Sequence, residues 1–326
     1  MVNHELERLK EKAIKNRNIG LEDAIMLYKI GLEKPFTLFA YASEITRFYK
    51  GKKISFCSII NAKSGLCPED CKFCAQSGHY NTDAEIYPLL PKKTIVERAA
   101  QAKKDGAHMF GIVTSGTQIY TVEEWDTIEE SVKAINEIGI LPCGSLGMVD
   151  KDRAKRLKKA GLFRYHHNLE TARSNFSNIC TTHDYDEDIE TIKNAKEAGL
   201  STCCGGIIGL GETMEQRIEL GLTIKELDVD SVPINILNPI KGTPLEHQQP
   251  LSPIEVLITL SIFRFIMPDK DIKVCGGKEK NLRQLLPLAI VAGCNSLMTG
   301  NYLTTPGRSA QLDVEMVMDL GFCPGI

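Results

Sequence analysis

Residues 186–208 read DEDIETIKNAKEAGLSTCCGGII and contain the structural unit on which the fold prediction rests. The part 186–198 carries apolar residues at helical spacing. Gly199 follows it directly, and glycine readily takes the left-handed conformation that ends many helices. The apolar run 201–208 begins two residues later and is typical of a buried strand. The stretch therefore predicts a helix, a glycine stop and a strand in close succession.

The same helix–glycine–strand unit recurs along the chain after residue 50. Further glycines directly follow predicted helices at Gly106, Gly139, Gly161 and Gly293. Strands are expected over 54–60, 108–114, 140–146, 163–169, 201–208, 231–237, 271–275 and 295–299, and helices over 94–104, 122–138, 151–159, 186–198, 213–227, 253–266 and 279–291. Eight parallel βα units predict an α/β fold with a closed (β/α)8 TIM-type barrel at 51–326, after an N-terminal helical extension at 1–50. An open doubly wound sheet is the alternative, but no G-x-G-x-x-G motif follows the first strand.

The composition excludes several classes of protein. With 326 residues, 43% hydrophobic and 25% charged, the chain has the composition of a globular protein and not of a disordered one. Its 39 basic and 42 acidic residues give a net charge of -3, so charge offers no argument for a nucleic-acid or membrane-surface partner. The longest apolar stretch, 285–298, is too short and too polar to span a bilayer. A charged N-terminus unlike a signal peptide and 11 cysteines predict a cytoplasmic protein with metal or redox chemistry.

Three cysteines lie close together on the loop that follows the first predicted strand. Cys67, Cys71 and Cys74 have the spacing C-x3-C-x2-C, and barrel enzymes carry their chemistry on loops at this end of the strands. Three thiolates can hold three irons of a cubane cluster and leave the fourth iron open for a substrate. A zinc site is the alternative, because structural zinc needs four ligands and His79 is near enough in sequence to be the fourth.

The cysteine triplet resembles that of the radical S-adenosylmethionine enzymes, and further segments resemble the biotin synthase family. These segments include 61–65, 67–77, 167–171, 205–213, 232–235, 241–245 and 303–306. The resemblance implies that Cys67, Cys71 and Cys74 hold a 4Fe-4S cluster to which S-adenosylmethionine binds. It implies radical insertion of sulfur into dethiobiotin to give biotin, the last step of biotin biosynthesis, with an auxiliary iron–sulfur cluster as sulfur donor. A flavodoxin or ferredoxin as reductant and a homodimer are implied in the same way.

The resemblance also gives ligand-binding roles to residues near the ends of the strands. It implies contacts to S-adenosylmethionine from Phe73, Asn168, Glu170, Gly205, Gly206, Gly211 and Glu212. It implies contacts to dethiobiotin from His166, Asn168, Asn235, Thr304 and Thr305. An amide such as Asn235 suits a cyclic urea because it offers both a donor and an acceptor. The alternatives are a tight strand-to-helix turn for the glycines and packing within the strand for His166.

Four further cysteines fall on alternate predicted strands: Cys57, Cys143, Cys203 and Cys275. Because the interior layers of an eight-stranded barrel take side chains from alternate strands, these thiols are expected to meet inside the barrel. For each one alone, the alternative is a small residue buried in the core.

At this place the chain departs from the family that it resembles. Gly111 stands where most members carry a cysteine, and Lys273 stands where they carry an arginine ligand. We therefore predict that Cys143, Cys203 and Cys275 hold the auxiliary cluster, with four irons in place of the family's usual 2Fe-2S. Secondary candidates are Cys57, Lys273 and Cys204, and the last should face away from Cys203 because strand side chains alternate.

Two other functions are compatible with parts of the sequence. One is another radical enzyme of this subgroup, of the hydrogenase maturase or methylornithine synthase type, which is expected to lack the pair Cys143 and Cys203 or to lack Asn235. The other is a non-catalytic metal-binding module, which would need an exposed partner surface. No role is assigned to Cys180, Cys294 or Cys323.

Overall fold

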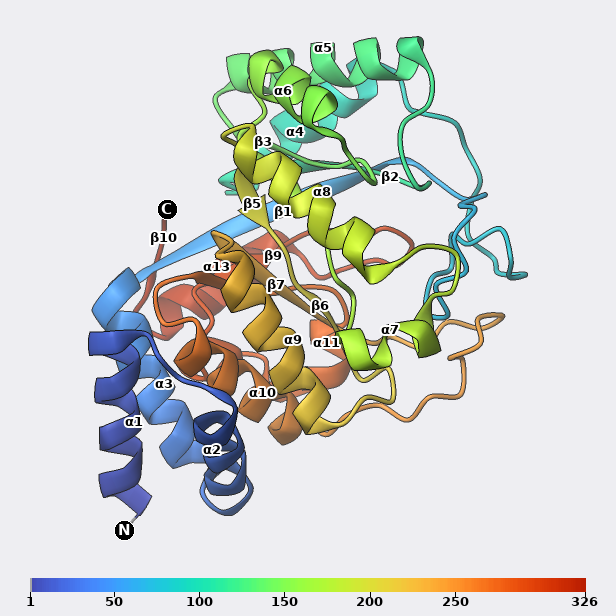
Figure 1. The fold of residues 1–326 in the computed structure, drawn as a ribbon. Coiled ribbons are helices and arrows are strands. Elements are labelled where there is room, and N and C mark those ends of the chain that lie inside the picture. Colours follow the sequence, from blue (N-terminus) through green and yellow to red (C-terminus); the bar gives the residue numbers. More distant parts are fainter. Residues whose placement is uncertain (1) are drawn as a thin grey trace.

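The computed structural model describes residues 2–326; Met1, the first residue of the predicted extension, lies outside this range. The centre of the molecule is a closed barrel of parallel strands (Figure 1). The strands are β1 (Lys53–Lys63), β2 (Met109–Thr114), β3 (Leu141–Ser145), β4 (Arg164–His166), β5 (Ser201–Cys203), β6 (Gly206–Ile208), β7 (Ser231–Ile236), β8 (Asp271–Val274) and β9 (Ser296–Met298). Pairing of β9 with β1 closes the barrel. The predicted (β/α)8 TIM-type barrel is confirmed, with β5 and β6 together as its fifth strand.

Helices connect the strands and cover the outside of the barrel. They are α4 (Lys92–Lys104), α5 (Val122–Ile138), α6 (Lys151–Ala160), α7 (Arg173–Ile179), α8 (Tyr185–Glu197), α9 (Met214–Leu227), α10 (Pro253–Ile266) and α13 (Ala310–Asp319). The glycine stops behave as predicted: Gly139 and Gly161 end α5 and α6 with φ of 77° and 96°. The short strand β10 (Cys323–Pro324) pairs with the beginning of β1 and was not predicted from the sequence, nor were α7 and α13.

The helix predicted over 279–291 is wrong as a single element. The segment forms α11 (Lys278–Leu282), a 3-10 turn (Arg283–Leu285) and α12 (Leu288–Val291). Arg283 has a φ of 52°, which is outside the helical region. Pro287 follows closely and has no backbone N–H to continue a helix.

The N-terminal segment forms three helices, as predicted: α1 (Val2–Asn16), α2 (Leu21–Glu33) and α3 (Pro35–Lys50). They pack against α10, on the side of the barrel away from α4, α5 and α6 (Figure 1). Leu27 of α2 and Phe39 of α3 belong to the same hydrophobic cluster as Phe263 of α10. The division of the chain into two domains at residue 50 stays a prediction. Among residues 2–326, no helix combines the length and the apolar composition that crossing a membrane requires.

Candidate active site

A cavity of about 320 Å³ occupies the inside of the barrel and reaches the loops at the carboxyl ends of its strands. The four cysteines predicted to meet inside the barrel all line this cavity: Cys57, Cys143, Cys203 and Cys275. They lie on β1, on β3, on β5 and directly after β8. Cys204 instead lies in the hydrophobic cluster outside the barrel wall, as the alternation of strand side chains predicts.

A buried lysine gives this thiol-lined wall a positive charge. Lys273 lines the cavity at 2% exposure, and the neighbouring thiols of Cys57 and Cys203 keep its pKa above the usual value although burial opposes this. Burial would raise the pKa of Cys203, but Lys273, His166 and Arg164 together outweigh burial and lower that pKa to about 6. Burial raises the pKa of Cys143 to about 12 and moves that of Cys275 upward as well. A cation among buried thiols favours their deprotonated form, which is the form that binds iron.

The position where the family usually carries another cysteine is occupied by Gly111 on β2. Gly111 lies opposite Cys143 on β3 and opposite Ile59 on β1. A Cβ on Gly111 would lie 3.1 Å from Cγ2 of Ile59, so a larger residue there would have to displace this side chain. Ile59 therefore fills part of the space that a side chain at position 111 would need.

The loop with the cysteine triplet is folded back on itself by backbone hydrogen bonds. The Cys67 amide donates to the Gln76 carbonyl at 3.0 Å, and the Cys74 amide donates to the Cys71 carbonyl at 2.9 Å. Cys74 lines the cavity, and all three thiols are partly buried. His79, the alternative zinc ligand, places Nε2 2.8 Å from the carbonyl oxygen of Pro68. Three thiols on one compact loop at the cavity fit a cubane cluster with one open iron.

Three of the residues expected to contact S-adenosylmethionine line the cavity: Phe73, Asn168 and Glu170. Glu170 follows β4 with a φ of 58°, a conformation uncommon for any residue other than glycine. Burial raises the pKa of its carboxyl group to about 7. The Asn168 side chain accepts a hydrogen bond from the Gly205 amide at 3.2 Å, which orients its amide group.

The four other residues expected to contact this cofactor are not among the described residues that line the cavity. Gly205, between β5 and β6, and Gly206, the first residue of β6, allow close backbone approach. A Cβ on Gly205 would lie 1.8 Å from the Pro233 carbonyl oxygen, and one on Gly206 would lie 2.6 Å from that of Glu170. This close approach explains why the strand predicted over 201–208 is divided in two. Glu212 follows Gly211 and is buried in an ion pair with Arg217 at 2.6 Å, so it stabilises the turn into α9.

The residues expected to contact dethiobiotin all lie on the cavity wall: His166, Asn168, Asn235, Thr304 and Thr305. They come from β4, β7 and the segment after β9. The Asn235 Oδ1 accepts a hydrogen bond from the Gly276 amide at 2.9 Å, which fixes the orientation of this side chain.

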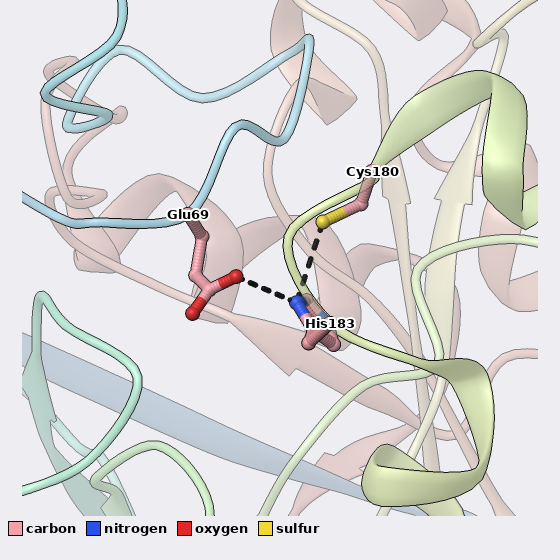
Figure 2. Close-up of side chains that lie close together, drawn as sticks. All are labelled: Glu69, Cys180 and His183. Atoms are coloured by element: carbon pink, nitrogen blue, oxygen red, sulfur yellow. Dashed lines mark hydrogen bonds and ion pairs between the residues drawn. The ribbon is translucent and has the colours of Figure 1, made fainter.

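Two features of the site were missed in the sequence. Arg164 is buried on the cavity wall, donates to the Ser201 hydroxyl at 2.9 Å and lies opposite Cys143. Its signal was a lone arginine within the apolar run 163–169. The second feature is a group of side chains behind the triplet loop: Glu69, Cys180 and His183 (Figure 2).

Comparison with known proteins places the chain in a family. Residues 63–223 match the Radical SAM superfamily, and residues 233–323 match the Biotin and Thiamin Synthesis associated domain. A biotin synthase of Geotalea daltonii is 50% identical over 97% of this chain and 96% of its own length. A biotin synthase of Geobacter metallireducens is 50% identical over 99% of both chains. The chain belongs to the biotin synthase family. As a radical S-adenosylmethionine enzyme, the chain requires a 4Fe-4S cluster and S-adenosylmethionine, and its match to the Biotin and Thiamin Synthesis associated domain indicates an auxiliary cluster.

Solved structures outside this family share the fold. A methylornithine synthase superposes with a TM-score of 0.84 over 98% of this chain and 97% of that chain, at 22% identity. An FeFe-hydrogenase maturase from Carboxydothermus hydrogenoformans superposes with a TM-score of 0.81 over 99% of this chain and 80% of that chain, at 17% identity. At these low identities the likeness shows a common fold alone. The biotin synthase relatives, at 50% identity, distinguish this chain from the methylornithine synthase and hydrogenase maturase types.

Proposed function

We propose that this chain inserts sulfur into dethiobiotin to give biotin, with S-adenosylmethionine as the source of the radical. One observation carries the proposal: a single cavity joins a thiol of the cysteine triplet to a second set of thiols deep in the barrel. The side chains Asn168 and Asn235 lie on the wall of the same cavity. Sulfur insertion needs such an arrangement, because the radical source and the sulfur source must reach the same substrate.

The residues of the chain bind, orient and protect the reactants. Cys67, Cys71 and Cys74 would hold the 4Fe-4S cluster, which when bound supplies the electron for reductive cleavage of S-adenosylmethionine. Asn168 and Glu170 orient the nucleoside, and Asn235 donates to and accepts from the ureido ring of dethiobiotin. The barrel wall excludes water, which protects a radical from side reactions.

The auxiliary cluster is proposed to bind to Cys143, Cys203 and Cys275 and to contain four irons. Three buried thiols that line one cavity support this ligand set, and Lys273 among them favours the thiolate state. Gly111 supports it as well, because the usual cysteine is absent there and Ile59 fills part of the space. Cys57 lies on the same wall and is the secondary candidate.

The activity is tested anaerobically with reconstituted protein, dethiobiotin, S-adenosylmethionine and a reductant. We expect biotin and 5′-deoxyadenosine to form together. Deoxyadenosine without biotin would reject dethiobiotin as the substrate and keep the radical chemistry. Absence of both products from fully iron-loaded protein would reject the radical chemistry as well.

The auxiliary cluster is tested by iron and sulfide analysis, with two adjacent cysteines as a matched pair. We expect iron for two four-iron clusters in the wild type. Cys203→Ser should lose about half of the iron and all biotin formation, because Cys203 faces the cavity. Cys204→Ser should retain both, because Cys204 faces the outer hydrophobic cluster. Wild-type iron for one four-iron and one two-iron cluster, or equal iron loss in both variants, would contradict the assignment.

We further propose a cytoplasmic location, a flavodoxin or ferredoxin as electron donor, and a homodimer. The 11 free cysteines support a reducing compartment. Light scattering of the purified chain would measure the oligomeric state, and a monomer would reject the dimer.

A further inference from the structure

Three side chains with different donor atoms converge behind the triplet loop, outside the barrel cavity (Figure 2). Glu69 belongs to the triplet loop, whereas Cys180 and His183 belong to the connection between α7 and α8. The Nδ1 atom of His183 lies 2.7 Å from Oε2 of Glu69 and 3.3 Å from Sγ of Cys180. All three donor atoms lie within 4.8 Å of one another. Two ligands of one tetrahedral zinc ion lie about 3.3 Å apart, so an ion fits this group once the hydrogen bond between Nδ1 and Oε2 opens slightly.

A second group of contacts fixes the orientation of these donors. The other ring nitrogen of His183, Nε2, lies 3.4 Å from Oδ2 of Asp188. A carboxylate on the far nitrogen is the usual support of a metal-binding histidine, because it fixes the tautomer and the ring orientation. Both oxygens of Glu69 accept hydrogen bonds, one from the Thr117 hydroxyl and one from the Thr182 hydroxyl. The histidine and the carboxylate are therefore held before any ion arrives.

We propose that Glu69, Cys180 and His183 bind one divalent transition-metal ion, with zinc as the best-fitting metal. One thiolate, one imidazole and one carboxylate are a borderline-soft donor set of the kind that zinc takes in four-coordinate sites. Zinc takes the thiolate of Cys180 and the neutral ring of His183, so any proton on Sγ or on Nδ1 leaves to solvent on binding. The Glu69 carboxylate needs no deprotonation at neutral pH. The fourth position of the ion is left for water.

The site would connect two parts of the chain that are far apart in sequence. Glu69 and His183 are separated by 114 positions. Sγ of Cys71 in the triplet lies 3.7 Å from Sγ of Cys180, so the ion would lie directly behind the 4Fe-4S loop. We infer that the ion anchors this loop to the segment before α8. The role is positional and does not depend on which substrate the cavity takes.

Zinc is the probe, and the full chain with both iron–sulfur clusters reconstituted is the sample. After incubation with zinc and gel filtration under anaerobic conditions, elemental analysis should find about one retained zinc per chain in addition to the iron. The zinc X-ray absorption spectrum should show one sulfur at about 2.3 Å and nitrogen or oxygen at about 2.0–2.1 Å. Zinc surrounded by three sulfurs would indicate occupation of a cluster site and would overturn the proposal. No retained zinc would overturn it as well.

Variants test the three ligands. Cys180→Ser and His183→Gln should each lower zinc retention at least tenfold while cluster iron and far-ultraviolet circular dichroism stay unchanged. Cys323→Ser is the matched control, because Cys323 is an exposed thiol that pairs with the start of β1, at the other end of the strand from the triplet. It should retain the zinc. Zinc should also raise the melting temperature of the wild type and leave that of His183→Gln unchanged. This comparison tests the site even if Cys180→Ser folds poorly. Retention of zinc by both ligand variants would overturn the proposal.

Discussion

Glu170 lies on the cavity wall, where its ionised carboxylate lowers the stability of the folded chain at neutral and alkaline pH. Burial raises the pKa of its carboxyl group from 4.5 to about 7. The folded chain therefore holds the proton up to about pH 7, whereas the unfolded chain releases it near pH 4.5. The contribution of the protonated carboxyl group to the free energy of unfolding is therefore complete below pH 4.5 and is lost as the pH rises through 7. For the cluster-free chain, Glu170→Gln should raise the free energy of unfolding at pH 8 by up to about 3 kcal/mol, with a much smaller gain at pH 5.

Urea unfolding at both pH values measures this difference, and Glu212→Gln is the control. Glu212 is buried as well, but it forms an ion pair with Arg217 at 2.6 Å. Arg217 keeps a second ion pair with Glu255 at 2.8 Å, so the loss of the Glu212 carboxylate should cost about 1–3 kcal/mol at pH 8. A loss of stability in Glu170→Gln at pH 8 would mean that the folded state stabilises the ionised carboxylate.

Sequence reasoning found those site residues whose position follows from a local rule. The spacing of Cys67, Cys71 and Cys74 predicted a cluster loop, and strand alternation predicted that Cys203 and Cys204 face opposite sides. The location of Glu212 behind the cavity wall was not predictable, because it depends on an ion pair with Arg217 on the following helix. The group Glu69, Cys180 and His183 was missed because two loops bring it together across 114 positions.

At the scale of elements, the break between β5 and β6 depends on the absence of a side chain at Gly205. A Cβ there would lie 1.8 Å from the Pro233 carbonyl oxygen, so a shift of β7 or of the break itself would be required. Gly205→Ala should lower the free energy of unfolding by about 3 kcal/mol or more, because neither backbone can move without straining the barrel. Urea unfolding followed by circular dichroism measures the loss.

Gly20→Ala is the matched glycine control for this variant. Gly20 precedes α2, and a Cβ on it would meet nothing within 4 Å. Gly20 is the N-cap of α2, where alanine is less favourable than glycine, so the effect of Gly20→Ala should stay within about 1 kcal/mol. If Gly205→Ala were as stable as Gly20→Ala, the close approach to β7 would not constrain residue 205.

Most elements were predictable because apolar runs mark eight strands and a glycine stop follows five of the predicted helices. The two exceptions differ in cause. The fifth strand is divided because the Pro233 carbonyl approaches Gly205, and this contact exists only in the assembled barrel. The helix predicted over 279–291 is broken near Arg283, whose φ of 52° has no marker in the sequence, but Pro287 inside the predicted range was a local sign of the break.

At the scale of the whole molecule, α10 is buried on all sides, which requires a cover on its outer face. Every residue from Val256 to Ile266 is buried. The barrel covers one face of α10, and α2 and α3 cover the other. The N-terminal helices are therefore part of the hydrophobic core, although the sequence pattern alone marked them only as a preceding helical segment.

This packing predicts that the extension and the barrel unfold together, and the chain contains a probe for it. Trp125 is the single tryptophan and lies on α5, in a hydrophobic cluster separate from that of α2 (Figure 1). Leu27→Ala, at a residue 0% exposed on α2, should lower the free energy of unfolding by about 2–5 kcal/mol. Leu32→Ala, at a leucine 61% exposed on the same helix, should change it by less than about 0.5 kcal/mol.

If one cooperative unit unfolds, Leu27→Ala shifts the urea transitions of Trp125 fluorescence and of circular dichroism equally. A Trp125 transition that stays in place while the dichroism shifts would show that the barrel holds its structure without the N-terminal helices.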